Sequence, residues 1–216
     1  MKIVEKAIFK FLNFQINNLY NKNFKKYGAS HESVFWNSQF NQFKRYEEIL
    51  ELLIQKEGIK KKIEVSDVGC GYGILYKLLN KENKFKNISY SGIDINKKFI
   101  DFCQNKYVKE LFCCTSFPPK MIDYCLMSGT YNLTKIKNVN LWENYVYTNL
   151  VQCSKKVKKG LIFNLQFSKI AKIHNNIFYC DPVKIRKLFT DEFYVYSRIS
   201  SILKNDIIFV LHKKLN

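Results

Sequence analysis

The feature that most constrains the fold is a short apolar strand that runs into a glycine-rich turn at residues 64–73, Glu-Val-Ser-Asp-Val-Gly-Cys-Gly-Tyr-Gly. A second short strand ends at Asp94, 21 residues after Gly73. Glycine permits positive φ angles and a close approach of a ligand to the backbone. A carboxylate at the end of the next strand can accept hydrogen bonds from both hydroxyls of a ribose. The two features together predict a site for a nucleoside-containing ligand.

The glycine spacing argues against a dinucleotide. The dinucleotide pattern G-x-G-x-x-G, begun at Gly69, requires a small residue at position 74, where this chain has Ile74. The third glycine comes one place early, at Gly73. The turn therefore favours a ligand without a pyrophosphate, such as adenosine with an amino-acid tail.

From residue 62 onward, short apolar strands alternate with helical segments, which predicts an α/β fold with a Rossmann-like, mostly parallel sheet and helices on both faces. Asp181 and Pro182 mark the start of the last helix. The connection 203–206 is too short for a crossover helix, so the last strand is expected to be antiparallel. The seven expected strands are 63–68, 89–94, 110–114, 122–127, 159–165, 193–200 and 206–212, with helices near 73–82, 97–107, 140–156 and 182–190.

The first 60 residues are expected to form a helical extension or lid on the core at 61–216, within a single domain covering 1–216. A second helix is predicted at 38–56 and ends at Gly58. The first helix is amphipathic, and its stripe either packs on the core or lies on a membrane surface. Packing is the commoner arrangement of the two. The predicted stripe consists of Ile3, Val4, Ala7, Ile8, Phe11, Leu12, Ile16, Leu19 and Tyr20.

The formal net charge of +18 suggests a nucleic acid or an anionic membrane as a partner. Lysine greatly outnumbers arginine, however, and asparagine, isoleucine, phenylalanine and tyrosine are also abundant, so the charge is also explained by compositional bias. The seven cysteines form no C-x-x-C pair, which indicates neither a disulfide framework nor a zinc site. A reducing, cytoplasmic setting is therefore expected. No apolar run reaches the roughly 18 residues of a membrane span.

Asp67 to Gly73, followed by Gly-Ile-Asp94-Ile, resembles motifs I and II of class I S-adenosylmethionine-dependent methyltransferases, over roughly residues 62–216. The resemblance implies S-adenosylmethionine (SAM) as cofactor, S-adenosylhomocysteine (SAH) as product, no metal, and a reversed last strand. The glycine loop would hold the methionine part and Asp94 the ribose. The chain departs from the family after the third strand, where Ser116 stands in place of an acid that holds the adenine. The expected cofactor contacts are Asp67, Gly69, Cys70, Gly71, Gly73, Asp94, Ile95, Ser116, Ser128, Gly129 and Arg45.

A narrower resemblance is to a poorly characterised group of bacterial methyltransferase-domain proteins. It implies that Trp36, Gln42 and Arg45 belong to a lid over the site, although Trp36 is also expected in a core and Arg45 on a solvated helix face. The segments that carry it are Tyr27-Gly-Ala-Ser, Trp36-Asn-Ser, Gln42-Phe-Lys-Arg45-Tyr and 123–132.

The segment Met127–Asn132 at the end of the fourth strand bears on the acceptor. It lacks the Pro-Pro pair of base-amine methyltransferases and the Pro-Cys pair of cytosine C5 enzymes. We expect a small-molecule acceptor contacted by Trp36, Tyr131 and Asn132, with Phe178 nearby. If a base is needed, the candidates are His31 and His174, each of which is also an ordinary surface residue. The alternatives are an RNA- or ribosome-directed methyltransferase, and a non-catalytic SAM-binding or membrane-peripheral protein. The acceptor atom and the oligomeric state stay open.

Overall fold

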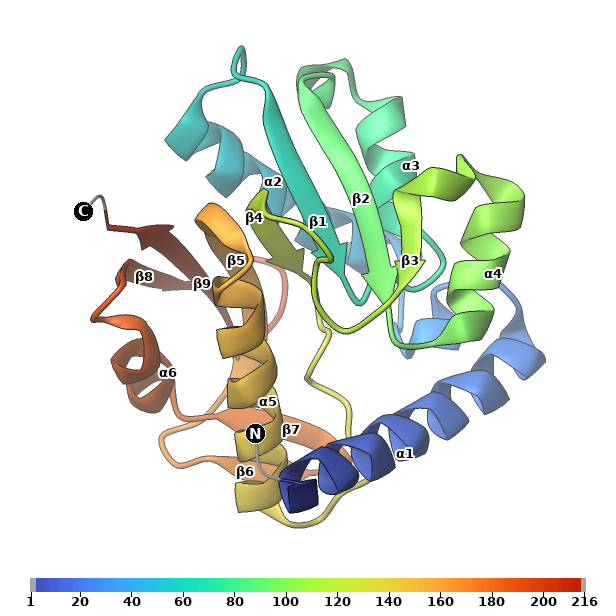
Figure 1. Ribbon diagram of the computed structural model, residues 1–216, viewed down its shortest axis with the longest axis vertical. Helices are drawn as coiled ribbons and strands as arrows, with labels where there is room; N and C mark the ends of the chain where they lie inside the picture. Colours follow the sequence, from blue (N-terminus) through green and yellow to red (C-terminus); the bar gives the residue numbers. More distant parts are fainter. Residues whose placement is uncertain (1–2, 215–216) are drawn as a thin grey trace.

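A computed structural model describes residues 3–214 and shows a twisted central sheet between two layers of helices (Figure 1). Its main strands lie in the order β3-β2-β1-β4-β5-β9-β8. β1 to β5 are mutually parallel, and β9 runs antiparallel to both β5 and β8. The prediction of a mostly parallel sheet with a reversed last strand is confirmed. These strands are β1 (Ile63–Val68), β2 (Ile88–Asp94), β3 (Phe112–Cys114), β4 (Ile122–Met127), β5 (Val157–Phe167), β8 (Phe193–Ile199) and β9 (Asp206–Lys213).

The expected count of seven strands is too low, because within residues 3–214 the sheet has nine. The two further strands, β6 (Lys172–His174) and β7 (Ile177–Cys180), form a hairpin in a segment expected to be a loop. Its turn residues, Asn175 and Asn176, have φ angles of 49° and 62°, the left-handed backbone of a tight hairpin turn that asparagine tolerates well. β7 extends the sheet from the carboxyl end of β5.

Helices cover both faces of the sheet, as predicted (Figure 1). On one face, α2, α3 and α4 bury side chains such as Leu50, Leu75 and Phe99 in one hydrophobic cluster. On the other face, α5 and α6 bury Trp142 and Ile185 in a second cluster. The helices are α1 (Ile3–Tyr27), α2 (Gln39–Glu57), α3 (Ile74–Lys81), α4 (Lys97–Lys106), α5 (Val139–Ser154) and α6 (Pro182–Phe189), with single 3-10 turns at Glu32–Val34, Asn83–Phe85 and Lys109–Leu111.

The first helix, α1, runs across the end of the sheet toward which the arrows of β1 and β2 point (Figure 1). Its inner side joins both hydrophobic clusters, through Phe9 and Leu12 at one end and Tyr20 and Phe24 at the other. The expectation that the helix packs on the core is therefore confirmed. The predicted stripe is only partly right, because its members Val4, Ile8 and Phe11 point outward. No helix of residues 3–214 is long and apolar enough to cross a membrane.

Candidate functional site

A cavity of about 850 Å³, part of it open to solvent, lies at the carboxyl ends of β1, β2, β3 and β4. This is the end of an open α/β sheet at which ligands bind. The walls of the cavity include the glycine loop, the segments after the other three strands, and side chains of α1, α2 and α5. Of the expected site residues, the cavity brings together Trp36, Gly69, Cys70, Gly71, Asp94, Ile95, Ser116, Ser128, Gly129 and Tyr131.

The glycine loop follows β1 and is shaped by left-handed backbone at every second residue. Gly69, Gly71 and Gly73 have φ angles of 79°, 53° and 80°, which residues with a Cβ adopt only with strain. A Cβ on Gly69 would also come within 2.6 Å of Thr130. Gly69 and Gly71 line the cavity, whereas Gly73 caps the start of α3 against Tyr107. The loop therefore presents bare backbone to the cavity.

The carboxyl group of Asp94 lies at the end of β2, beside this loop. Its Oδ2 accepts a hydrogen bond from the Gly71 N–H at 3.0 Å and its Oδ1 one from the Asn96 N–H at 2.8 Å. Each carboxylate oxygen can accept a second bond, so both can still receive a ligand hydroxyl. Burial raises the pKa of Asp94 to about 6, against the lowering effect of these N–H donors. Asp94 is thus ionised at neutral pH and faces the cavity.

Asp67 does not line the cavity, although the sequence suggests a place near the ligand. Its side chain is completely buried behind the loop, where Oδ2 accepts a hydrogen bond from the Tyr90 hydroxyl at 3.1 Å. Burial raises the pKa of Asp67 to about 8, and the nearby Asp94 adds to the effect. The carboxyl group is therefore mostly protonated at neutral pH, and its hydrogen bond joins β1 to β2.

The segment after β4 forms the opposite wall of the cavity. The Gly129 N–H donates to Asn164 Oδ1 at 2.8 Å, and the Thr130 hydroxyl donates to the Val68 carbonyl at 2.7 Å. Ser128 is 8% exposed, and its buried hydroxyl has no hydrogen-bond partner among the described residues. A buried hydroxyl without a partner is costly, and a bound polar ligand would supply one. Asn132 turns away from the cavity and accepts from the Gln166 N–H.

Helix α1 closes the cavity with Ile16, Asn17 and Tyr20, none of which the sequence singled out as a ligand contact. Asn17 Nδ2 donates to the Ile95 carbonyl at 3.2 Å, while its Oδ1 has no partner within the described part of the chain. Asn21 Oδ1 accepts from Asn96 Nδ2 at 3.0 Å. Asn17 and Asn21 are four residues apart, so they share one helix face. Asn13, whose Oδ1 accepts from the Tyr145 hydroxyl, precedes them by one turn. Three asparagines spaced four residues apart on the inner side of an amphipathic helix are the sequence signal that could have identified this wall.

Trp36 reaches the cavity from the connection between α1 and α2. The preceding residue, Phe35, has a φ angle of 62°, which is rare for a bulky side chain and typical of a strained functional turn. The guanidinium carbon of Arg45 lies 5.1 Å from the centre of the Trp36 ring. Arg45 itself does not line the cavity, and at 1% exposure it is not on a solvated helix face. Of the three residues expected in a lid, Trp36 and Gln42 line the cavity, and Arg45 packs behind the Trp36 ring.

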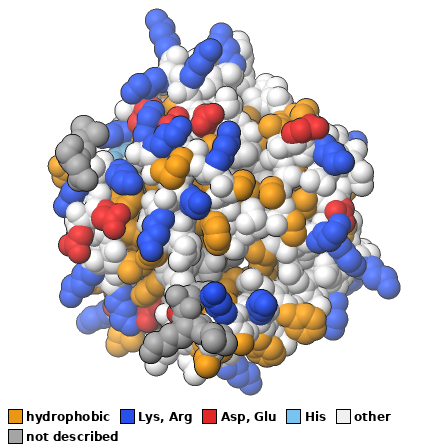
Figure 2. All heavy atoms as spheres, viewed as in Figure 1, with side chains coloured by type: hydrophobic (Ala, Val, Ile, Leu, Met, Phe, Trp, Pro, Cys, Tyr) orange, Lys and Arg blue, Asp and Glu red, His pale blue; other side chains and the backbone are white. Residues whose placement is uncertain are grey.

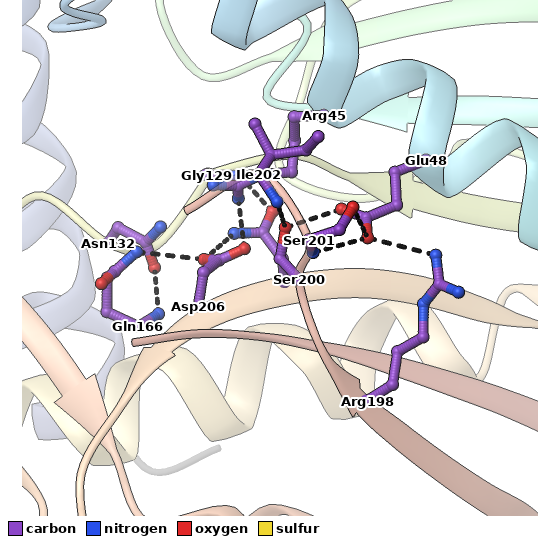
Figure 3. Close-up of polar contacts among 11 residues, drawn as sticks. Arg45, Glu48, Gly129, Asn132, Gln166, Arg198, Ser200, Ser201, Ile202 and Asp206 are labelled. Carbon is purple, nitrogen blue, oxygen red and sulfur yellow. Dashed lines mark hydrogen bonds and ion pairs between the residues drawn. The ribbon is translucent and has the colours of Figure 1, made fainter. Parts of the chain in front are cut away.

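The Arg45 guanidinium belongs to a buried polar network beneath the segment after β4 (Figure 3). Arg45 Nη1 lies 2.9 Å from Asp206 Oδ2, and Asp206 Oδ1 accepts from Asn164 Nδ2 at 2.8 Å. Because Asn164 also accepts from the Gly129 N–H, the network connects α2, β5 and β9 to the cavity wall. Glu48, one turn after Arg45, accepts from Arg198, Ser200 and Ser201 near the end of β8.

Tyrosines supply most of the hydroxyl groups at the cavity. Tyr20, Tyr46, Tyr131 and Tyr145 all line it, and burial raises the pKa of each above its ordinary value. They are therefore neutral at neutral pH and act as hydrogen-bond donors or packing surfaces rather than as bases.

Neither histidine considered as a base lies at the cavity. His31 pairs with Glu32 at 3.2 Å, and His174 is an exposed residue of β6 rather than of a loop. Phe178 is fully buried in a hydrophobic cluster and does not line the cavity. Within residues 3–214 no group of three or more His, Cys, Asp and Glu side chains is placed to hold a metal ion.

Comparison with protein-family models and with curated proteins finds no match to this sequence. Solved structures match in fold. Magnesium protoporphyrin IX methyltransferase from Synechocystis PCC 6803, with bound SAM, has a TM-score of 0.58 at 13% identity, and the match covers 99% of each chain. A SAM-dependent methyltransferase from Leishmania major has a TM-score of 0.66 at 11% identity, covering 91% of this chain and 82% of the other.

The plantazolicin methyltransferase BpumL, in complex with a pentazolic desmethylPZN analog and SAH, has a TM-score of 0.59 at 14% identity and is covered completely, as is this chain. These three structures share the overall fold of this chain at identities too low to carry over a substrate. The chain has the fold of the class I SAM-dependent methyltransferases.

Proposed function

We propose that the protein binds SAM in the cavity at the carboxyl ends of β1 to β4 and transfers its methyl group to a small-molecule acceptor. The observation that carries the proposal is the pairing of the bare glycine loop with the ionised carboxylate of Asp94, whose two oxygens each keep a free acceptor position. The unpartnered oxygens of Ser128 and Asn17 add two polar contacts for a ligand. These groups fit a nucleoside joined to an amino acid.

Bound SAM would supply an activated methyl group on a sulfonium, so the protein need only orient the acceptor and exclude water. Trp36, Tyr46 and Tyr131 lie on the cavity wall and can pack against an acceptor while their surroundings keep water out. No base is required when the acceptor is already nucleophilic. The neutral tyrosines and the absence of a histidine among the described lining residues support such an acceptor.

The small-molecule acceptor is favoured over RNA by the cavity itself. Its described lining contains no lysine or arginine, although the whole chain carries a charge of +18. Cationic side chains hold the phosphates of an RNA acceptor, and the described wall of this cavity offers none of them. RNA is therefore the second candidate, and it rests on net charge alone.

Cofactor binding is tested by calorimetric titration with SAM, SAH and NAD. Wild type should bind SAM and SAH but not NAD. Asp94→Ala should lose about 100-fold in affinity, because two hydrogen bonds to a charged group are worth about 1.5 kcal/mol or more each. The matched control is Asp101→Ala, which removes an exposed carboxylate of α4 that pairs with Lys97. The SAM affinity of this control variant should equal that of wild type. Tight NAD binding, or unchanged SAM affinity in Asp94→Ala, would contradict the proposal.

The acceptor class is tested by incubating the protein and methyl-labelled SAM with a metabolite extract and, separately, with RNA. Label should enter a small molecule, and Asp94→Ala should abolish its incorporation. Label in the RNA fraction that depends on Asp94 would replace the small-molecule acceptor with the second candidate. SAM binding with no label in either fraction would favour a non-catalytic SAM-binding protein.

A further inference from the structure

Helix α1 has a second apolar stripe on the side away from the cavity, and at its start Val4 and Ile8 border a second pocket with Leu141 of α5. Val4, Ile8, Phe11 and Phe14 are 70%, 36%, 55% and 59% exposed. At 3.6 residues per turn these four positions fall within about 120° of the helix circumference. Scattered single exposed hydrophobic residues are ordinary, but a row of large ones on one helix face marks an interaction surface. We call Val4, Ile8, Phe11 and Phe14 the outer stripe.

The charges around the outer stripe are almost all positive. Lys10 is exposed at the edge of the stripe next to Phe14, and Lys22, Lys25 and Lys26 are exposed on the same helix face farther along. The helix has one acidic residue, Glu5. Figure 2 shows hydrophobic and cationic side chains side by side along the lower edge of the molecule, where α1 runs in Figure 1. An apolar stripe bordered by lysines is the pattern of helices that lie in the surface of an anionic membrane.

We propose that the outer stripe of α1 docks the protein on a lipid bilayer that contains anionic phospholipids. Charge complementarity favours this occupant over a second copy of the chain, because two copies would bring the same lysines together. It also favours the bilayer over RNA, because aliphatic side chains such as Val4 and Ile8 gain nothing from phosphates, whereas the interior of a bilayer solvates them.

Docking would place the membrane close to the cavity. The opposite side of α1 contributes Ile16, Asn17 and Tyr20 to the cavity wall, and an α-helix with its side chains is only about 10 Å across. The bilayer would therefore lie about one helix diameter from the bound cofactor. The docking surface does not depend on methyl transfer, so it can be tested independently of the proposed activity.

The experiment is co-sedimentation of the full chain with vesicles of phosphatidylcholine and phosphatidylglycerol, and with vesicles of phosphatidylcholine alone. Wild type should sediment with the mixed vesicles, less so at high salt, and not with phosphatidylcholine alone. The double variant Phe11→Ser/Phe14→Ser should bind at least about tenfold more weakly. Phe40→Ser is the matched control, because Phe40 is 67% exposed on α2; it should bind like wild type. Circular dichroism establishes that each variant is folded.

Two results would overturn the proposal. One is failure of the wild type to sediment with the mixed vesicles, or equal sedimentation of wild type and Phe11→Ser/Phe14→Ser. The other is a dimer, measured by light scattering, that the double variant converts to a monomer, since the outer stripe would then be the contact between two copies.

Discussion

The pair between Arg45 and Asp206 offers a sharp test of the buried network. The two side chains are 1% and 0% exposed, and Arg45 Nη1 lies 2.9 Å from Asp206 Oδ2. Burial raises the pKa of Asp206 to about 6 from the ordinary 3.8, in spite of the guanidinium. That difference corresponds to about 3 kcal/mol of unfavourable ionisation at neutral pH. Desolvation therefore outweighs the attraction for the Asp206 carboxylate, and we predict that the pair adds no net stability.

Removing one partner should nevertheless be severe. Arg45→Met leaves a carboxylate buried without its cation, and Asp206→Asn leaves the cation without its carboxylate. Each single variant should lose about 3–5 kcal/mol in free energy of unfolding at pH 7.5. The double variant Arg45→Met/Asp206→Asn should recover to within about 1–2 kcal/mol of wild type. Neither charge of the pair is then present, and the amide oxygen introduced at position 206 can still accept from Asn164.

Urea unfolding followed by tryptophan fluorescence measures these free energies. The control is Lys97→Met, which breaks an exposed pair with Asp101 and should cost no more than about 0.5 kcal/mol. Arg45→Met should also regain more stability than wild type between pH 7.5 and 5.5, because protonation removes the unpaired charge of Asp206. The reasoning is refuted if the single variants lose less than about 1 kcal/mol, or if the double variant loses the sum of both.

Three further predictions concern Asp94, Asp67 and Gly69. SAM affinity, by calorimetry, should be constant above pH 7 and weaken as pH falls through about 6, because protonated Asp94 loses acceptor capacity; constant affinity down to pH 5 would argue against its role. The pKa of Asp67 in the folded protein, about 8, lies above the ordinary 3.8, so the free energy of unfolding should fall as pH rises from 4 to 8. Asp67→Asn should reduce this fall, measured by urea unfolding at each pH. An unchanged slope would refute the role of Asp67. Gly69→Ala should lose more stability than Gly28→Ala in thermal melts, since both have positive φ but only the Gly69 methyl meets Thr130; equal losses would contradict this.

The sequence predicted the parts of the molecule that depend on local pattern. The glycine turn, the strand end at Asp94 and the short link before the last strand are each defined within a few residues, and the structure has all three. The β6–β7 hairpin also has a local signal, the pair Asn175 and Asn176 between apolar residues, but its strands are too short to stand out.

The environment of Arg45 could not be predicted in this way. On α2 it stands among Lys44, Glu47 and Glu48, a typical pattern of a solvated helix face, and its burial depends on groups of β5 and β9 that are remote in sequence. The orientation of helix α1 was also hard to predict, because the helix has two apolar stripes. Periodicity identified the helix as amphipathic but combined residues of the inner and outer sides.

The contacts of Glu48 can form only late in the synthesis of the chain. Its partners Arg198 and Ser201 are 150 and 153 residues farther along the chain, which a ribosome adds in roughly 8–30 s at about 5–20 residues per second. Until then the Glu48 carboxylate and the Arg45 guanidinium on α2 lack their native ionic partners. The helix is therefore expected to dock late, so a nascent chain stalled before β9 would display an open cofactor loop and an unattached α2, a state that proteases and chaperones can recognise.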